Sequence, residues 1–502
     1  MALNLQFLEG SNINNVIAGH DEYIAVKEVY SIIHPLSFKH FFMAVISGNA
    51  LYYGRIMFYI DALVAYIPFV VFGVKGMVLT IRMFHALLIV ASLILLAKTF
   101  FEKQWQKYLL FVSVALLYYT MYFIMMPKPE PMQLFFLSWF FNRFKAKKYQ
   151  FSWSFILLGI AYGIKFNVLL MLPIICIIPF LYQSKFEVKT HLKPALKALA
   201  GFVIGLIIAV PCLAFSVIRP IFLQTYLHET FGGTEKGYDN ANLDMLQWMD
   251  SGLGGSYLGL GALAIPFVGF IGFLLFKSIK HEMRTKDFAA SMLLSIGLLM
   301  AIFIMFKTKR LWPHYLWTAY IFMVVGALIG IAKTESKYLK TVLITCMMIF
   351  ISSSMFFSLT RELPLFLTLS KTEEVQKDTK WSKQTIDYIK NKYPNSRIST
   401  DGSILYPFED FVKVDIYHPF EGKAKDETST AFYWYSDKPE NMYTENNDLL
   451  VFYKRLPERM LKEKPNIYVG QQEELYKQFK SKIPSVYQRD TSFGEIIVYK
   501  KK

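Results

Sequence analysis

Long apolar runs separated by short polar segments fill the chain up to about residue 360. They lie near residues 52–73, 77–97, 108–126, 131–142, 151–164, 166–183, 198–217, 258–276, 288–306, 314–332 and 341–359. Many approach the roughly 20 residues with which a helix crosses a bilayer. The pattern predicts an α-helical polytopic membrane protein with about 10 spans and additional juxtamembrane helices.

The pattern changes after about residue 370, where polar residues dominate. The stretches "TIDYIKNKY" and "EELYKQFKSK" have the spacing of amphipathic helices, and "NIYVG" and "EIIVYK" that of short strands. We therefore predict three parts: an N-terminal outer segment with juxtamembrane helices at 1–76, a transmembrane domain at 77–360, and a small soluble α/β domain at 361–502.

Composition agrees with the membrane class. Hydrophobic residues make up 54% of the chain and charged residues 18%, below the roughly 25% of soluble domains. The net charge of +16 lies largely in short loops, which indicates membrane topology and anionic lipid headgroups rather than nucleic acid. The three cysteines lie inside apolar runs and lack metal-ligand spacing. The N-terminus lacks the basic start and apolar core of a signal peptide.

The distribution of Lys and Arg predicts the orientation. Basic loops at 98–107, 143–148, 184–197, 277–287 and 333–340 are expected in the cytoplasm. Alternation then places "PKPEP" (127–131), the loop 218–257 and the C-terminal domain outside. The run 52–73 contains Arg55 and Asp61, which favours a re-entrant or interfacial helix over a full span. The N-terminal segment is then also outside.

Two acidic sites are candidates for chemistry. Asp21 and Glu22 lie in "AGHDEYIAV", where a carboxylate could act as a catalytic base. The alternative is a solvated acidic start of an amphipathic helix. Lys128 and Glu130 lie among the prolines of "PKPEP". That motif suits a helix-breaking hairpin, but a charged pair at this depth also requires water or a partner.

Basic side chains form a second group of candidates. Arg55, Lys165 and Arg310 lie at the outer ends of apolar runs, against the usual bias, and could donate charge-assisted hydrogen bonds to a lipid phosphate. Tyr315 follows Arg310 in "RLWPHYLW", which also suits an aromatic belt at the interface. The loop 218–257 adds His228 and Glu229, either as a site for a metal or an acceptor or as part of a flexible lid.

The order and membrane side of these motifs resemble the GT-C type integral-membrane glycosyltransferases. The bacterial branch with the lipid A aminoarabinose transferase and relatives of protein O-mannosyltransferases is the most similar. The stretches that carry the resemblance are "HDEY", "YYGRIMF", "LTIRMFHALL", "PKPEP", "GIAYGIKFN" and "RLWPHYLW". Each is short, but together they extend over nearly the whole chain.

The resemblance implies a GT-C fold, a polyprenyl-phosphate sugar donor and inversion at the sugar carbon. It implies a lipid, glycan or protein acceptor at the outer face of a bacterial inner membrane. Asp21 resembles the catalytic base, Glu22 its neighbour and Glu130 the second acidic position. Arg55, Lys165 and Tyr315 resemble residues that hold the lipid phosphate, and Lys128 is a possible acceptor contact. No cofactor is assigned, and a divalent metal is left open.

The chain departs from the family in two ways. The family has a transmembrane helix ahead of the Asp-Glu loop, which the printed sequence lacks. The family also has a basic residue soon after the acidic pair, where this chain has Tyr23 and Ile24. We expect Lys27 or another residue to supply that contact.

Two other classes are weighed against the enzyme. A transporter or lipid flippase often has internal repeats and polar residues at the membrane midplane. Here we find no repeat, and the polar candidates group at one face. The missing first helix also motivates a non-catalytic, degenerate homologue.

Overall fold

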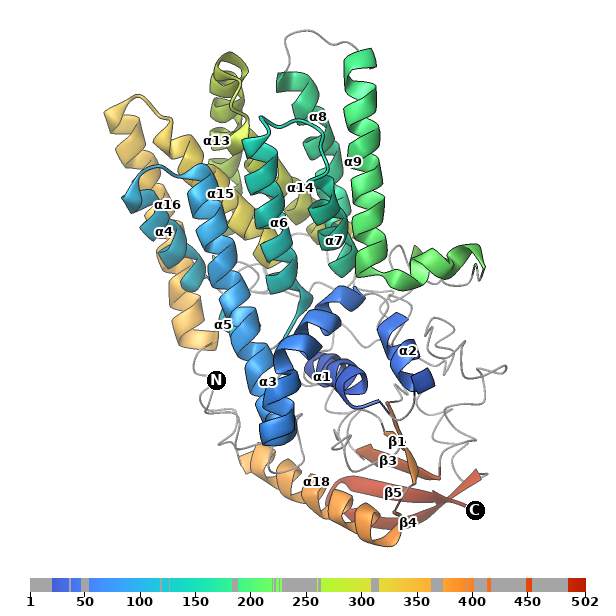
Figure 1. The fold of residues 1–502 in the computed structure, drawn as a ribbon. Helices are drawn as coiled ribbons and strands as arrows, with labels where there is room; N and C mark the ends of the chain where they lie inside the picture. Colours follow the sequence, from blue (N-terminus) through green and yellow to red (C-terminus); the bar gives the residue numbers. More distant parts are fainter. Residues whose placement is uncertain are drawn as a thin grey trace.

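The computed structural model describes a helical bundle and a smaller region with a β-sheet (Figure 1). The described residues are 20–35, 38–46, 54–117, 120–125, 127–182, 188–218, 220, 223–224, 226–227, 260, 263–307, 316–362, 373–394, 396–400, 413–416, 448–453 and 486–502.

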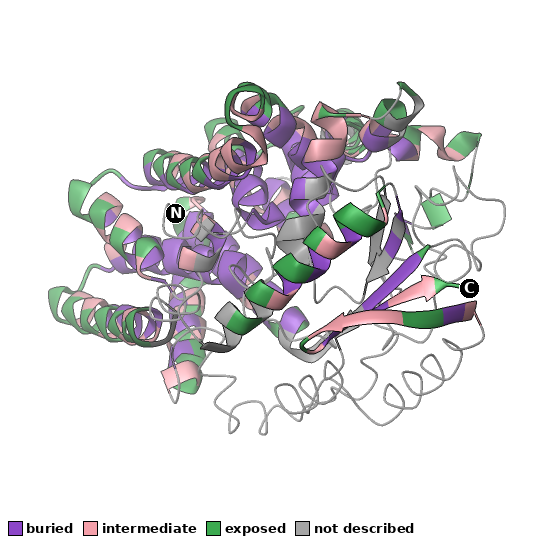
Figure 2. Cartoon of the chain, turned by 90° about the horizontal axis from the view of Figure 1, so that it is seen from below, coloured by how far each residue is buried: buried purple, intermediate pink, exposed green. Residues whose placement is uncertain are grey.

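The bundle is built from helices that follow the apolar runs and from two helices that precede the first run. Their bounds are α1 (His20–Ile33), α2 (Phe38–Ile46), α3 (Arg55–Phe100), α4 (Gln104–Ala115), α5 (Thr120–Met125), α6 (Pro129–Ala146), α7 (Phe155–Ile164), η3 (Phe166–Met171), α8 (Leu172–Tyr182), α9 (Val188–Ala209), η4 (Pro211–Val217), α13 (Ala264–Thr285), α14 (Ala289–Lys307), α15 (Trp317–Ala332), α16 (Lys337–Phe357) and η7 (Ser358–Glu362). Seen from below, buried positions concentrate inside the bundle and exposed positions on its peripheral helices (Figure 2).

Four helical segments within the described residues are long and apolar enough to cross a membrane. They are Arg55–Phe100, Leu192–Ala209, Ala264–Thr285 and Lys337–Thr360. Shorter apolar helices are Phe155–Ile164, Phe166–Tyr182, Ala289–Ile304 and Trp317–Ala332. The predicted helical membrane class is thus confirmed, whereas the total of about 10 spans stays a prediction.

Helix α3 doubles back on itself at Gly73. Gly73 has a φ of 64°, which favours glycine, and it divides the helix into a first arm (55–72) and a second arm (74–100). Asp61 on the first arm lies 3.0 Å from His85 on the second. An unbroken helix would hold these two residues about 36 Å apart. The runs 52–73 and 77–97 are therefore separate elements, as the sequence predicts.

The first arm carries a strongly exposed apolar face. Leu63, Ile67 and Phe72 are 79%, 72% and 71% exposed, while Arg55 and Asp61 on the same arm are buried. A helix with one apolar exposed face and buried polar groups suits the lipid interface. This arrangement fits the predicted interfacial helix.

The C-terminal region contains one described long helix and a five-stranded sheet. Helix α18 (Glu373–Lys392) precedes β1 (Arg397–Thr400), β2 (Lys413–Ile416), β3 (Leu449–Tyr453), β4 (Tyr487–Phe493) and β5 (Ile496–Lys501). The strand order is β2-β1-β3-β5-β4, with β1 parallel to β2 and β3, and β5 antiparallel to β3 and β4. The predicted helix in "TIDYIKNKY" and strand in "EIIVYK" are found, whereas "EELYKQFKSK" and "NIYVG" lie outside the described residues.

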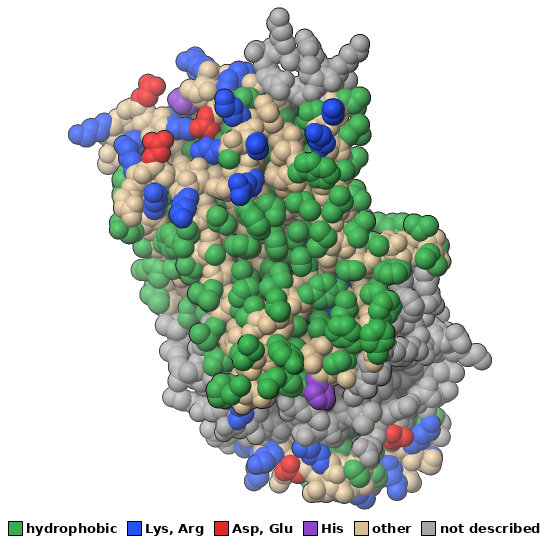
Figure 3. All heavy atoms as spheres, in the orientation of Figure 1, with side chains coloured by type: hydrophobic (Ala, Val, Ile, Leu, Met, Phe, Trp, Pro, Cys, Tyr) green, Lys and Arg blue, Asp and Glu red, His purple; other side chains and the backbone are tan. Residues whose placement is uncertain are grey.

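Lys and Arg side chains gather at one end of the bundle, above a broad apolar band (Figure 3). At this end Glu282 of α13 is fully buried. Its carboxylate accepts hydrogen bonds from the backbone N–H groups of Ala290 and Ser291, both at 2.9 Å, and from Lys333 Nζ at 2.8 Å. The carboxylate therefore stabilises the N-terminus of α14.

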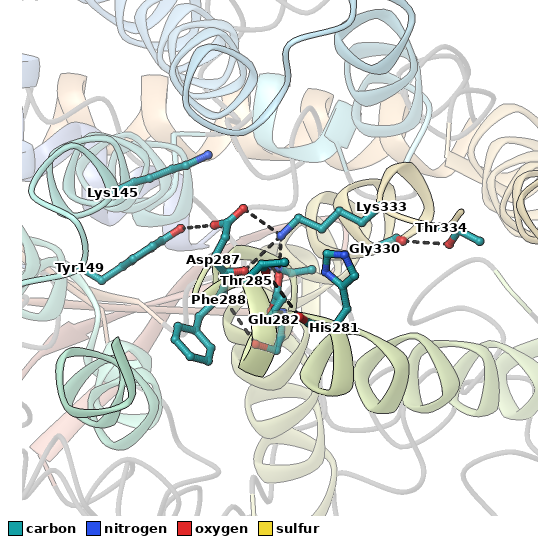
Figure 4. A network of polar contacts seen from close by, with 12 residues as sticks. Lys145, Tyr149, His281, Glu282, Thr285, Asp287, Phe288, Gly330, Lys333 and Thr334 are labelled. Carbon is teal, nitrogen blue, oxygen red and sulfur yellow. Dashed lines mark hydrogen bonds and ion pairs between the residues drawn. The ribbon is translucent and has the colours of Figure 1, made fainter. Parts of the chain in front are cut away.

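Asp287 extends the same network (Figure 4). It accepts a hydrogen bond from the Tyr149 hydroxyl at 3.0 Å and lies 2.9 Å from Lys333 Nζ. Burial would raise the pKa of this carboxyl, but the Lys333 ammonium and the Tyr149 hydroxyl together hold the pKa below its usual range. The network joins α13, α14 and α15 to the loop after α6 at the basic end.

Candidate active site

The candidate site lies where the start of α3 meets the end of α7. The Gly54 N–H donates to the Ile164 carbonyl at 3.4 Å. A Cβ atom at Gly54 would lie 2.6 Å from the Gly163 carbonyl oxygen, so only glycine allows this approach. The contact brings Arg55, the first residue of α3, close to Lys165, which ends α7.

Arg55 is fully buried and joins three helices. Its Nη1 donates to Glu28 Oε2 of α1 at 2.6 Å, and its Nη2 donates to the Ala44 carbonyl of α2. The guanidinium also lies 4.7 Å from the centre of the Phe58 ring. Arg55 therefore holds α1 and α2 against α3 through its two terminal nitrogens, while its Nε has no partner among the described residues.

Glu28 is a site residue that the sequence analysis missed. It is 3% exposed and lies seven residues after Asp21 in α1. Positions seven apart on a helix share a face. In the amphipathic stretch "EYIAVKEVYSII", Glu28 lies on the face expected to be buried, and a charged residue there is the signal that could have indicated it.

Glu130 and Lys165 form a buried ion pair. Glu130 lies in the first turn of α6, behind Pro129 and the N-cap residue Lys128. Proline suits the first helical turn, and the helix N-terminus stabilises a carboxylate. Lys165 has an extended backbone at the break between α7 and η3. The turn and the break predicted at these two motifs thus bring two candidate residues together.

Gln133 is the second residue that the sequence analysis missed. Its Nε2 lies 3.1 Å from the Ala161 carbonyl oxygen, 2.7 Å from the Lys165 carbonyl oxygen and 2.8 Å from Asn167 Oδ1. It therefore satisfies carbonyl groups exposed where α7 ends. A polar residue one turn after Glu130, near the start of the apolar run 131–142, is the signal that could have indicated it.

A third buried pair connects the two arms of α3. His85 Nε2 lies 3.0 Å and 3.1 Å from the two carboxylate oxygens of Asp61. Both side chains are almost fully buried. The pair fixes the angle between the first arm, which begins at Arg55, and the second arm.

The other candidates are less completely placed. Asp21 and Glu22 occupy the first turn of α1, but their side chains are outside the described residues, as is that of Lys27. Carboxylates in a first turn also fit the helix-start interpretation that the sequence left open. His228, Glu229, Arg310 and Tyr315 lie outside the described residues.

The described residues contain no cluster of three or more His, Cys, Asp or Glu side chains placed to hold a metal ion. What they provide around the starts of α3 and α6 is two ammonium groups, Lys128 and Lys165, with the carboxylates of Glu28 and Glu130 and the guanidinium of Arg55. All are buried except Lys165, whose side chain is 12% exposed. Such groups can stabilise and orient an anionic substrate.

The fold was compared with known proteins. No family model and no curated protein sequence matches the chain. Two solved structures of ArnT from Cupriavidus metallidurans do match. The form bound to undecaprenyl phosphate is 12% identical, with a TM-score of 0.56 over 99% of this chain and 96% of that chain. The apo form is 12% identical, with a TM-score of 0.53 over the same shares. The resemblance expected from the motifs is thus confirmed at the level of the fold, and this chain has the GT-C fold of ArnT, a lipid A aminoarabinose transferase.

Proposed function

We propose that the protein is an inverting glycosyltransferase. It moves a sugar from a polyprenyl-phosphate donor to a lipid, glycan or protein acceptor. The observation that carries the proposal is the Lys165–Glu130 ion pair, at the end of α6 opposite Lys145 and the basic network. The Gly54–Ile164 contact joins the start of α3 to the segment that carries Lys165. The ArnT-like fold supports the proposal, since one ArnT structure holds undecaprenyl phosphate.

The roles follow from the charge that develops during transfer. As the glycosidic bond breaks, the phosphate gains negative charge, and a preformed ammonium group stabilises it. We assign this role to Lys165, with Arg310 and Tyr315 as further phosphate contacts. Asp21 acts as the base for the acceptor, with Glu22 in support. Lys128, His228 and Glu229 contact the acceptor or belong to a lid.

Arg55 has a different role from the one its motif implies. Its guanidinium contacts Glu28 and the Ala44 carbonyl, so we assign it to holding α1 in place. Because α1 begins with the acidic pair, Arg55 controls the position of the proposed base. Its contribution in this proposal is to the activation of the acceptor, whereas Lys165 stabilises the leaving phosphate.

A transfer assay tests the function directly. The protein is reconstituted in proteoliposomes with radiolabelled polyprenyl-phosphate sugars and extracted glycolipids as acceptors. We expect the wild type to transfer label, and Lys165→Gln to lower kcat/KM about a hundredfold because the leaving phosphate loses its ammonium. Lys337→Gln, an exposed lysine at the basic end, serves as the control.

Two results of that assay would count against the proposal. If no lipid-linked sugar were transferred, the proposed glycosyltransferase activity would be rejected. If Lys165→Gln left the rate unchanged, the role assigned to Lys165 would be rejected. Repeating the assay with EDTA determines whether a divalent metal takes part.

We also propose the orientation. The protein is a multi-pass protein of a bacterial inner membrane, with the acidic pair, "PKPEP" and the soluble α/β domain at 361–502 on the outer side. Its parts are the outer segment 1–76 and the transmembrane domain 77–360.

Cysteine labelling checks this orientation. In a background without Cys176, Cys212 and Cys346, single cysteines replace Asp21 or Lys103. A membrane-impermeant maleimide applied to intact spheroplasts is expected to label position 21 and spare position 103. Labelling of position 103 alone would place the acidic pair in the cytoplasm and reject the proposed topology.

A further inference from the structure

Three buried side-chain oxygen atoms on α6 have no hydrogen-bond partner among the described residues: Glu130 Oε2, Gln133 Oε1 and Ser138 Oγ. The first two belong to residues one helical turn apart that both contact Lys165. Glu130 is 2% exposed and Gln133 is fully buried. Residues three apart on a helix are neighbours on one face. Buried polar atoms of this kind are usually satisfied, so an unpaired couple at a candidate site indicates a ligand.

The neighbouring groups determine which atoms of Glu130 and Gln133 remain without a partner among the described residues. Gln133 directs its amide nitrogen toward three acceptors, the carbonyl oxygens of Ala161 and Lys165 and Asn167 Oδ1. Flipping the amide would place an oxygen against all three, which is unfavourable. Glu130 Oε1 already faces the Lys165 ammonium. Each side chain therefore presents one further oxygen that can only accept.

We propose that Glu130 and Gln133 form a subsite for the sugar of the lipid-linked donor. Two acceptors one helical turn apart complement a group with several O–H or N–H donors. The sugar of a polyprenyl-phosphate donor is bonded directly to the phosphate that we assign to Lys165, and Lys165 contacts both Glu130 and Gln133. The inference rests on the proposed function and adds the sugar class: one with hydroxyl or ammonium groups near its phosphate.

Two hydrogen-bond acceptors are suited to bind a sugar and are not suited to bind a phosphate. A phosphate oxygen is itself an acceptor and would be repelled by Glu130 Oε2. A hydroxyl or an ammonium group is attracted there, and the interaction is strong because the acceptor is charged. The subsite therefore favours the sugar-bearing lipid over the bare lipid phosphate.

A binding experiment with the full chain in detergent tests the proposal. The probes are polyprenyl phosphate, polyprenyl-phosphate mannose and polyprenyl-phosphate aminoarabinose. In Glu130→Gln, the new amide turns its oxygen to Lys165 and places an N–H₂ donor where Oε2 was. We expect at least one sugar-bearing probe to bind about tenfold more weakly, while the bare lipid phosphate binds as well as before or better.

Two further variants make the result specific. Gln133→Leu removes the second acceptor and is expected to weaken the binding of the same probe. Retained binding of polyprenyl phosphate shows that the variant has folded. Ser138→Ala removes the third unpaired oxygen of α6, five residues beyond Gln133, and is expected to leave the binding of all three probes unchanged. If only the mannose probe loses binding, the group bound at the subsite is a hydroxyl. If only the aminoarabinose probe loses binding, the group is an ammonium.

Each remaining outcome overturns the inference. If Glu130→Gln and Gln133→Leu weakened the bare lipid phosphate as much as the sugar-bearing probes, or weakened none, the sugar subsite would be rejected while the proposed function stood. If the wild type bound none of the three probes, the proposed function and the subsite would both be rejected.

Discussion

Asp21→Asn is expected to lower the rate of sugar transfer by about 10²- to 10⁴-fold, the usual effect of a positioned general base. Asparagine has nearly the shape of aspartate but cannot take the proton of an attacking hydroxyl or amine. The lipid-linked donor should bind as it does to the wild type, because Glu130 on α6 and Lys165 at the break after α7 belong to other elements than α1. The measurement is single-turnover transfer from the radiolabelled donor, together with donor affinity.

The controls separate catalysis from helix stability. Asp21 also lies in the first turn of α1, where a carboxylate stabilises the helix by roughly 0.3–1 kcal/mol. Asp21→Asn should therefore shift the thermal midpoint only slightly. Glu335→Gln, at an exposed position of the basic end, should change neither rate nor midpoint. Full transfer by Asp21→Asn would instead identify the acidic pair as a helix start alone.

Glu28→Ala is expected to lower the free energy of unfolding by about 3–5 kcal/mol. It leaves the fully buried Arg55 guanidinium without the carboxylate 2.6 Å away. An isolated buried charge is far more costly than a broken surface pair. The thermal midpoint in detergent measures the loss, and slower transfer should accompany it because α1 carries the proposed base.

A double variant and a variant of a surface ion pair test whether the loss of stability comes from the unpaired buried charge of Arg55. Glu28→Leu with Arg55→Met removes both charges and should recover most of the stability, since apolar replacement of a buried pair is often neutral. Lys392→Ala breaks the Lys392–Asp490 pair, whose lysine is 49% exposed, and should lower the midpoint much less. Equal effects of Glu28→Ala and Lys392→Ala would contradict the buried anchor.

Much of the architecture follows from short stretches of sequence. The apolar runs predict helices, and the prolines of "PKPEP" predict the break before α6. The apolar run that contains Arg55 and Asp61 predicts an element distinct from the next helix, and the structure separates the two at Gly73. These features depend on hydropathy, helix period and backbone restriction, which neighbouring residues determine.

The partners of the charged groups depend on contacts distant in sequence. The sequence motif predicts Arg55 as a phosphate contact, which stays a prediction, and it gives no sign that Nη1 of Arg55 contacts Glu28, 27 residues away in sequence. Asp61 and His85 are 24 residues apart, and Gln133 reaches Asn167 across 34. Hydropathy marked Glu28 and Gln133 only as polar residues in helical stretches.

The sequence by itself determined that this is a helical membrane protein with acidic and basic candidates at the ends of its apolar runs, because burial in lipid restricts which residues a span can hold. Only the tertiary structure decided that Lys165 pairs with Glu130, that Arg55 anchors α1, and that Gln133 completes the site. A buried charge takes whichever partner the packed helices bring within hydrogen-bond reach, and helix packing is not encoded in any one stretch.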